Sequence, residues 1–294
     1  MNEKIYLIPK NIEQCLDLLK KYDGEAVIIA GGTDLMLSLK EKKISKKAII
    51  DITEIPELKK LQFTDDTLNI GASITHAQIA KNIWIGDHMQ ALAEACNSIG
   101  SPQIRNIATL VGNIVNAQPA ADSAIALVAM DAKVEVMSDS RIYLESVENL
   151  YKGVGKSKIN SYKELVTKII IDLPVYGSGT AFRRISQREA LSLPILNVSI
   201  FITIFKGKIK NVRIVIGPVA KNPFRPVKAE QILIGKQYDD SKAFKEAALM
   251  ASTEANPRNS IFRGSKEYRS VLIKFLVYDT LKVAIKNAMK EDVR

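Results

Sequence analysis

The stretch Ile28-Ile-Ala-Gly-Gly-Thr-Asp-Leu35 places two glycines directly after an apolar run, Ala26–Ala30, that predicts a short buried strand. The glycines allow a tight turn and a close approach to a ligand, and a helix can begin near Thr33 and Asp34. Backbone N–H groups at such a strand-to-helix turn suit a phosphate. The stretch matches neither GxGxxG nor GxxxxGK[ST], so by itself it fits a plain turn as well as a phosphate site.

The residues on either side of this stretch predict a compact βαβ-like unit. Asn11 followed by Gln14 resembles a capping box, which favours a helix that begins there. One face of that helix is apolar, because its apolar residues recur at helical spacing: Ile12, Cys15, Leu16, Leu19 and Tyr22. A further strand is predicted at Lys47–Asp51.

Beyond about residue 58 the pattern changes to short strands and helices separated by turns, which indicates a mixed α+β arrangement. Residues 175–179 are typical of a linker. Three antiparallel strands are predicted at 181–186, 196–205 and 212–216, and 228–290 is largely helical in pattern. We therefore expect an α+β fold with a first domain at 1–175, divided into subdomains 1–57 and 58–175, and a C-terminal domain at 180–294.

A second unusual segment, Gly100–Ser123, is rich in small and hydrogen-bonding residues although it lies between two apolar helices. Loops of this chemistry often position a ligand. The segment contains Thr109-Leu-Val-Gly-Asn113 and, near its end, the carboxylate of Asp122. Asp122 fits both a ligand contact and a helix N-terminal charge favoured by the helix dipole, and the residues alone leave both open.

Composition excludes several classes of protein. Hydrophobic residues make up 47% and charged residues 25%, as in ordinary globular proteins. Apolar stretches such as Ile195–Phe205 are shorter than the roughly 20 residues of a membrane span, and the N-terminus lacks a secretory pattern. We expect a cytoplasmic protein. The net charge of +10 is spread over scattered lysine pairs and few residues are aromatic, so we expect no nucleic-acid partner.

The two cysteines and two histidines predict no metal site. Cys15 and Cys96 occupy apolar helix positions and are interpreted as buried thiols. An iron-sulfur cluster needs about four thiolates, so any such cluster belongs on a partner. His76 and His88 lack partners at ligand spacing and are interpreted as surface or helix-capping residues.

Taken together, the two loops resemble the pyrophosphate-binding motifs of the FAD subunits of the xanthine dehydrogenase and carbon monoxide dehydrogenase family. Ala30-Gly-Gly-Thr-Asp34 and Thr109-Leu-Val-Gly-Asn113 lie about 80 residues apart. Further segments resemble family blocks in the expected order and extend the resemblance over essentially the whole chain: Ser101–Arg105, Pro119–Ser123, Ala181–Leu191, Val212–Gly217 and Arg263–Arg269.

The resemblance implies that FAD binds to this chain. It assigns the diphosphate and ribityl contacts to the two loops, namely Ile28, Ile29, Ala30, Gly31, Gly32, Thr33, Asp34, Leu35, Thr109, Gly112 and Asn113. Asp122 is expected to bind the adenosine part, and Ile99 either packs near a ring of FAD or belongs to the core. Arg183 or Arg184 is expected near the flavin, where a positive charge favours the anionic reduced form. No residue is assigned as an acid-base catalyst.

The same resemblance implies partner subunits. In this family a large molybdopterin subunit hydroxylates the substrate, and a small subunit with 2Fe-2S clusters passes electrons to FAD, from which NAD or another acceptor takes them. A dimer of heterotrimers is expected. The alternatives are the FAD subunit of a nicotinate, aldehyde or carbon monoxide dehydrogenase, a stand-alone FAD-dependent reductase, and a non-catalytic nucleotide-binding or scaffold protein.

One residue departs from the family pattern. The second loop usually reads Thr-x-Gly-Gly-Asn, whereas Val111 stands here in place of the first glycine. A β-branched residue disfavours positive φ. Either this position does not need positive φ or the loop path differs locally, and Gly112 becomes the more essential of the pair.

Overall fold

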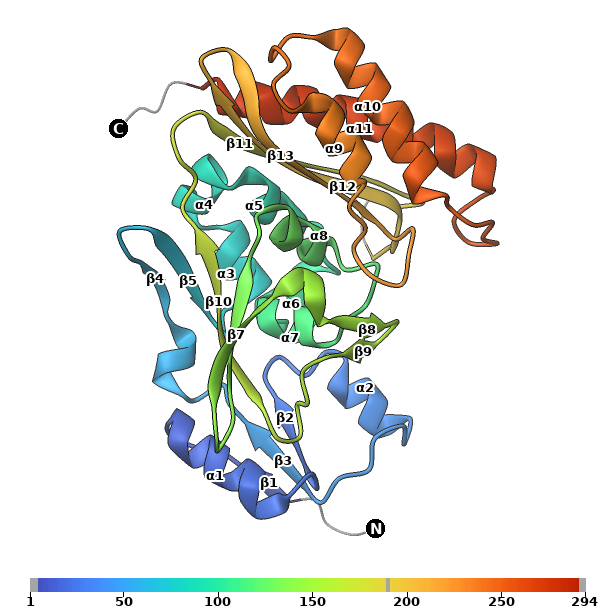
Figure 1. The fold of residues 1–294 in the computed structure, drawn as a ribbon. Helices are drawn as coiled ribbons and strands as arrows, with labels where there is room; N and C mark the ends of the chain where they lie inside the picture. Colours follow the sequence, from blue (N-terminus) through green and yellow to red (C-terminus); the bar gives the residue numbers. More distant parts are fainter. Residues whose placement is uncertain (1–4, 189–190, 291–294) are drawn as a thin grey trace.

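The computed structural model describes residues 5–188 and 191–290. Three sheets follow one another along the molecule, from a small parallel sheet at one end to a helix-covered antiparallel sheet at the other (Figure 1). Helices and loops fill the space between the second and third sheets (Figure 1). The α+β fold predicted from the sequence is confirmed, while the expected domain boundaries stay a prediction.

The first sheet is built from the βαβ-like unit. Its strands pair in parallel in the order β1-β3-β2. Asn11 caps the first helix, as predicted, because its side chain accepts a hydrogen bond from the backbone N–H of Gln14 at 2.8 Å. The elements are β1 (Ile5–Leu7), α1 (Ile12–Tyr22), β2 (Ala26–Ile29), α2 (Leu35–Lys40) and β3 (Ala48–Asp51).

The second sheet is antiparallel, with the order β4-β5-β10-β6-β7. Its central strand, β10, is the last of the five in sequence. It pairs with β6, about 30 residues earlier, and with β5, about 100 residues earlier. The strands are β4 (Leu61–Phe63), β5 (Thr67–Gly71), β6 (Lys133–Met137), β7 (Ile142–Ser146) and β10 (Leu165–Asp172). A hairpin of β8 (Tyr151–Gly153) and β9 (Lys156–Ser157) lies beside them.

Short helices connect these strands, and two of them, α6 and α7, occupy a segment that the sequence indicated only as a loop. The helices are α3 (His76–Ala80), α4 (Ile83–His88), α5 (Gln90–Asn97), α6 (Pro102–Ile107), α7 (Leu110–Val115) and α8 (Asp122–Ala129), with 3-10 turns at Pro56–Lys59 and Val147–Leu150. Every residue of α8 is buried. Such a helix carries apolar residues on all sides because it has no solvent face.

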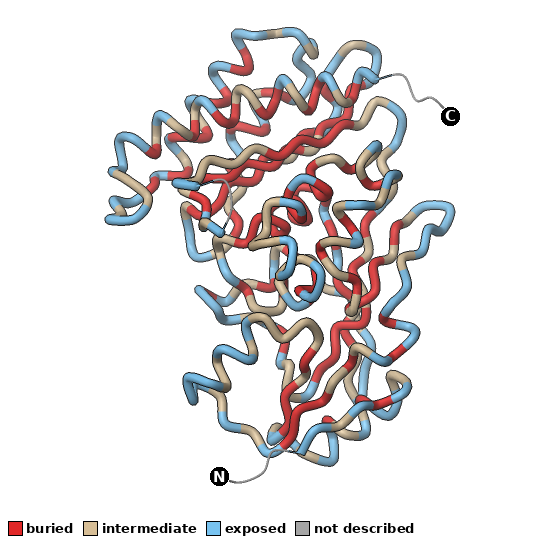
Figure 2. The backbone as a smooth tube through the Cα atoms, turned by 180° about the vertical axis from the view of Figure 1, so that it is seen from behind, coloured by how far each residue is buried: buried red, intermediate tan, exposed pale blue. Residues whose placement is uncertain are grey.

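The third sheet pairs β11 (Ser178–Ser186), β12 (Pro194–Phe205) and β13 (Lys208–Gly217) in antiparallel order, as predicted. Helices α5 and α8 pack against one face, and α9 (Val227–Leu233) and α11 (Lys266–Ala288) against the other, with α10 (Ser241–Ala255) on α9 and α11. Because both faces are covered, β12 is buried along most of its length (Figure 2).

Two large hydrophobic cores hold these layers. One joins the first two sheets and their helices, and also contains Phe182 and Val215 from the third sheet. The other lies between the third sheet and the C-terminal helices. Cys15 and Cys96 are buried free thiols, as predicted.

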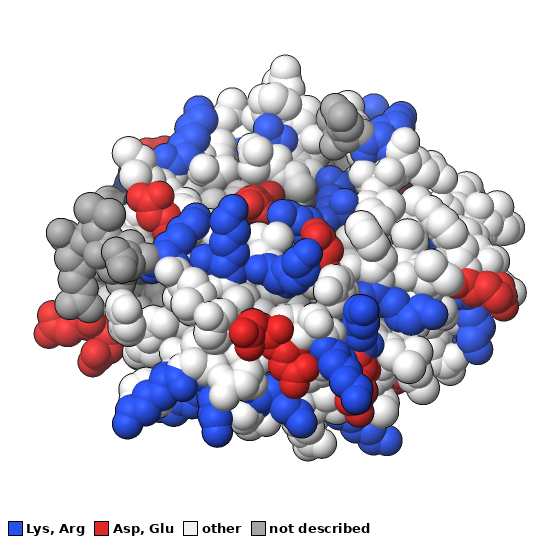
Figure 3. Space-filling model, turned by 90° about the horizontal axis from the view of Figure 1, so that it is seen from above, with Lys and Arg blue, Asp and Glu red and all other residues white. Residues whose placement is uncertain are grey.

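The charged surface is mixed. Viewed onto the end formed by the third sheet, several Lys and Arg side chains lie next to one another across the middle of the face, and Asp and Glu side chains lie beside them (Figure 3). No helix within residues 5–188 and 191–290 is long and apolar enough to cross a membrane.

Gly179 shows how tightly β11 and α11 pack. A Cβ atom at this position would lie 2.3 Å from the carbonyl oxygen of Ala284 and from the backbone nitrogen of Ala288. We therefore expect Gly179→Ala to lower the free energy of unfolding by about 1–3 kcal/mol, because helix and strand must move apart. Denaturant titration measures this, and Gly86→Ala, with open space at its Cβ, is the control.

Candidate functional site

The two glycine-containing loops meet at Gly31. A Cβ atom there would lie 2.0 Å from the carbonyl oxygen of Ile107, so only glycine allows this approach. Two backbone hydrogen bonds hold the second loop beside α3: His76 donates to the oxygen of Ala108 at 3.0 Å, and Leu110 to that of Ile74 at 3.1 Å. Loops that are distant in sequence thus form one continuous surface.

This surface lines a cavity of about 580 Å³ between the first two sheets. Its size is within the range of small-molecule and cofactor sites, roughly 300–1,000 Å³. Most of the residues predicted to bind the cofactor lie in its wall: Ile28, Ile29, Ala30, Gly31, Gly32, Thr33, Asp34, Leu35, Ile99, Thr109, Gly112 and Asn113. The structure therefore brings together both loops and Ile99.

The first loop presents backbone donors to the cavity. Within the described residues, the N–H groups of Gly31–Asp34 make no hydrogen bond to another part of the chain. Gly32 has a φ of 69°, which turns the backbone sharply between strand and helix. Successive backbone N–H groups without an internal acceptor form a concave site that suits an anionic group such as a diphosphate.

The second loop resolves the question raised by Val111. Residues Leu110–Val115 form α7, capped by Thr109, whose hydroxyl accepts from the N–H of Gly112 at 3.1 Å. Val111 has no positive φ, so its position does not need a glycine. Gly112 has no positive φ either, so its backbone conformation does not require glycine. A Cβ there would contact only the Thr109 hydroxyl, and the missing side chain leaves room in the cavity.

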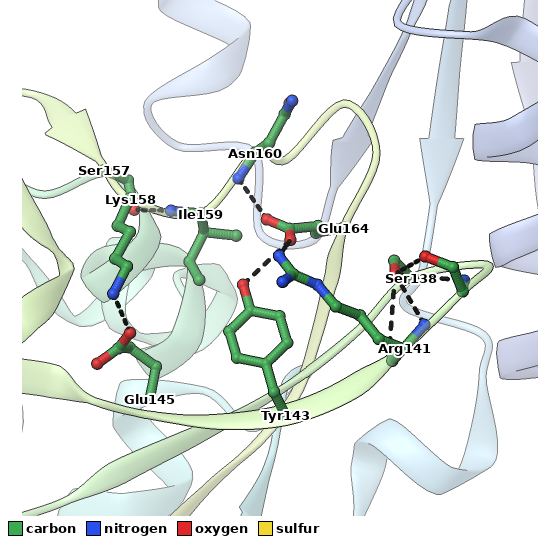
Figure 4. A network of polar contacts seen from close by, with 10 residues as sticks. Ser138, Arg141, Tyr143, Glu145, Ser157, Lys158, Ile159, Asn160 and Glu164 are labelled. Atoms are coloured by element: carbon green, nitrogen blue, oxygen red, sulfur yellow. Dashed lines mark hydrogen bonds and ion pairs between the residues drawn. The ribbon is translucent and has the colours of Figure 1, made fainter.

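One wall of the cavity was not predicted from the sequence: it comes from residues 157–166, which run from the end of β9 to the start of β10. The carboxylate of Glu164 anchors it, accepting hydrogen bonds from Tyr143 Oη at 3.0 Å, Arg141 Nη2 at 3.2 Å and the backbone N–H of Asn160 at 2.8 Å (Figure 4). Lys158 and Glu145 form an ion pair nearby (Figure 4). Side chains of β7, Tyr143 and Glu145, therefore hold this wall in place, although β7 is not part of either glycine loop.

His76 also lines the cavity, and its interpretation as a surface or capping residue is wrong. Its side chain is fully buried, and the helix cap is Thr75. Nδ1 lies 3.4 Å from Cys96 Sγ, whereas the buried Nε2 has no hydrogen-bond partner within the described residues. Burial, with a smaller effect of Arg105, lowers the pKa of the imidazole to about 4, so His76 is neutral near pH 7.

Asp122 and Arg184 lie outside the cavity wall and contact each other. Arg184 Nε is 3.5 Å from Asp122 Oδ2, and Asp122 also accepts from Asn197 at 2.6 Å and Ser98 at 3.0 Å. Burial raises the pKa of the Asp122 carboxyl, and these partners oppose the rise. Arg184 also donates to the Ser98 carbonyl at 2.9 Å, next to Ile99 of the cavity wall.

Arg183 has acidic partners outside the cavity. Its Nε is 3.3 Å from Asp279 on α11, and its Nη1 is 3.6 Å from Glu94 on α5. The direct contacts with FAD expected for Asp122, Arg183 and Arg184 stay predictions. No group of three or more His, Cys, Asp or Glu among the described residues could hold a metal ion.

Comparison with known families decides what kind of site this is. The family described as "FAD binding domain in molybdopterin dehydrogenase" matches residues 1–174, and the "CO dehydrogenase flavoprotein C-terminal domain" matches residues 181–284. The chain is a member of the FAD-binding subunits of the molybdenum hydroxylase family. The resemblance predicted from the two loops is confirmed, and with it the assignment to oxidoreductase subunits.

Curated relatives of this FAD-binding subunit span most of its length. The nicotinate dehydrogenase FAD-subunit of Eubacterium barkeri is 29% identical over 80% of this chain and 81% of its own. The xanthine dehydrogenase FAD-binding subunit of Escherichia coli O157:H7 is 29% identical over 89% of each chain. The 6-hydroxypseudooxynicotine dehydrogenase complex subunit alpha of Paenarthrobacter nicotinovorans is 30% identical over 96% of this chain and 95% of its own.

Solved structures share the fold of the FAD-binding subunit. A carbon monoxide dehydrogenase from Hydrogenophaga pseudoflava matches with a TM-score of 0.88 and 23% identity, covering 98% of this chain and 99% of that one. Quinoline 2-oxidoreductase from Pseudomonas putida 86 matches with a TM-score of 0.88 and 22% identity, with the same coverage. The arrangement of three sheets is therefore common to these proteins.

The contact at Gly31 predicts that the cavity is sensitive to a single methyl group. In Gly31→Ala the added Cβ would overlap the Ile107 carbonyl, so the two loops must separate. We expect a loss of about 1–3 kcal/mol in the free energy of unfolding together with weaker FAD retention. Thermal unfolding and flavin content measure the two effects. Gly86→Ala, at a helix position with open space for the methyl group, should keep FAD and should not lose stability. A Gly31→Ala protein with normal stability would contradict the contact.

The lowered pKa of His76 predicts a pH-dependent stability. Below about pH 6.5 the unfolded chain binds a proton at this imidazole, whereas the folded chain does so only near pH 4. The unfolded state therefore binds more protons, and the free energy of unfolding falls by about 3 kcal/mol as the pH is lowered through this window. His76→Gln has no imidazole to titrate. Denaturant titrations of both apoproteins between pH 6.5 and pH 4 should therefore show a larger fall in the free energy of unfolding for the wild type than for the variant. Parallel pH profiles would refute the prediction.

Proposed function

We propose that this chain is the FAD-carrying electron-transfer subunit of a xanthine dehydrogenase-like molybdenum hydroxylase. The observation that carries the proposal is the cavity in which the two glycine loops meet, on a chain that belongs to a family of FAD-binding subunits. In the proposed complex this chain holds FAD, whose redox chemistry connects 2Fe-2S clusters on a small partner subunit with NAD or another acceptor.

The chemistry of the cavity supports a dinucleotide ligand. The N–H groups of Gly31–Asp34, which have no acceptor in the part of the chain that the structure describes, suit the diphosphate. Thr33, Asn113 and Asn116 supply short polar side chains in the same wall. Apolar residues of the same cavity wall offer contacts for ring systems: Val27, Leu35, Ile44, Ile99, Ile104 and Leu165. A diphosphate that joins two ring-bearing halves is common to dinucleotides, and the match to an FAD-binding domain over residues 1–174 favours FAD among them.

The partners proposed are a molybdopterin-binding large subunit and a 2Fe-2S small subunit, assembled as a dimer of heterotrimers in the cytoplasm. Support comes from relatives named as the FAD subunit, medium subunit or complex subunit of dehydrogenases and hydroxylases. Substrate hydroxylation would take place on the large subunit. The chain alone should therefore show flavin redox activity and hydroxylate no substrate.

Gly112 provides the test of FAD binding. The position faces the cavity, and a Cβ there meets only Thr109 Oγ1, at 2.9 Å. We expect Gly112→Leu to fold and to lose FAD, because the larger side chain fills space next to the proposed diphosphate. Flavin absorbance per protein and circular dichroism measure the two properties.

The matched control is Gly112→Ala, whose methyl group disturbs only the Thr109 cap, at a cost of about 1 kcal/mol or less. This variant should keep most of its FAD. Two results would contradict the proposal: wild-type protein that stays colourless after FAD is added, or Gly112→Leu protein that retains stoichiometric flavin.

A further inference from the structure

The loop before α11 exposes two large apolar side chains. Ile261 is 97% exposed and Phe262 is 79% exposed. The loop lies where α10 and α11 meet, at the end of the helices that cover the third sheet (Figure 1). Side chains this exposed add almost nothing to the stability of the chain itself, and a group of them indicates a partner.

One face of α11 continues this apolar surface. Tyr268, Val271 and Phe275 are exposed, and their spacing of three and four residues places them on the same side of the helix. Tyr268 also lies against the loop, because a Cβ at Gly264, two residues after Phe262, would meet the Tyr268 ring at 2.7 Å. Loop and helix thus form one docking surface, which consists of Ile261, Phe262, Tyr268, Val271 and Phe275.

The docking surface has a cationic rim. Residues 255–278 contain five cationic residues and a single acidic one. Arg258 and Lys266 are exposed, and neither forms an ion pair with an acidic side chain in the described parts of the chain. An apolar centre surrounded by charged residues is the usual anatomy of a protein–protein interface, and a cationic rim favours a partner with an acidic one.

Hydrogen bonds connect the docking surface to the wall of the cavity. Gln187 Nε2 donates to the carbonyl oxygen of Phe262 at 3.0 Å. Gln187 follows Arg184 by three residues, which span at most about 11 Å. Arg184 in turn donates to the carbonyl oxygen of Ser98, the residue before Ile99 of the cavity wall. A protein that docks on Phe262 would therefore lie beside the part of the wall that β11 holds.

We propose that this docking surface binds the 2Fe-2S small subunit, the electron donor of the proposed complex. This inference rests on the proposed function, in which only the small subunit has to come close to the flavin. The flavin is expected beside Arg183 or Arg184, and both residues belong to β11. A 2Fe-2S cluster with four thiolate ligands carries a net negative charge, which a cationic rim attracts.

The apolar part of the surface is tested with the double variant Ile261→Ser/Phe262→Ser of the full, FAD-loaded chain. We expect its dissociation constant for the purified 2Fe-2S subunit to rise at least about tenfold, because an aromatic anchor and its neighbour are removed. Biolayer interferometry measures the affinity. FAD content and the unfolding temperature should not change, since both side chains lie in solvent. The matched control is Ile83→Ser, which removes another exposed isoleucine, on α4.

The rim is tested with Arg258→Glu/Lys266→Glu, and the matched control is Lys208→Glu/Lys210→Glu, at exposed positions of β13. We expect the rim variant to associate about tenfold more slowly at low salt and to lose most of its salt dependence, while the control does neither.

Two results would overturn the proposal. In one, both surface variants bind the small subunit as the wild type does. In the other, the apolar variant keeps the small subunit and loses the large subunit, a second copy of this chain or anionic phospholipid vesicles instead. A wild-type chain that binds no small subunit at all would count against the proposed function rather than against this surface.

Discussion

The close passage of Gly31 over the carbonyl of Ile107 is the constraint on which the proposed cofactor site depends. It places the turn that follows β2 against the C-terminal end of α6, with no room for a side chain. The backbone donors of the first loop and the capped turn of the second thereby face one cavity. Backbone rather than side chains builds the centre of the site, which explains why the first loop carries two consecutive glycines and the second keeps Gly112.

The sequence predicted the parts of this site that depend on local signals. A buried strand followed by two glycines, and the Asn11 cap of the preceding helix, are properties of a few consecutive residues. The wall at 157–166 had no such signal, because Glu164 is held by Tyr143 of β7 and by Arg141, the residue just before that strand. The burial of His76 likewise depends on a distant segment, because α5 packs against it through Cys96. The residues next to His76 in the sequence do not indicate this contact.

Val111 shows why a departure from a family pattern need not change a site. The expected difficulty was positive φ, which a β-branched residue disfavours. The position is instead part of α7, where φ is negative and the side chain is buried. The glycine that matters is Gly112, whose missing side chain leaves space in the cavity. The sequence shows that valine replaces a glycine at position 111, but only the backbone conformation shows that this position does not require glycine.

The third sheet reaches the cavity through a polar link rather than by contributing to its wall. Arg184 on β11 pairs with Asp122 at the start of α8 and donates to the carbonyl of Ser98, the residue before Ile99. Removing Arg184 would leave the buried carboxylate of Asp122 without its cation, a costly state in a site of low dielectric. Because Arg184 belongs to β11 and is hydrogen-bonded to the residue before Ile99, the position of Ile99 depends on the position of the third sheet. Residues that resemble ligand contacts in the sequence can thus influence a ligand through the wall that they hold in place.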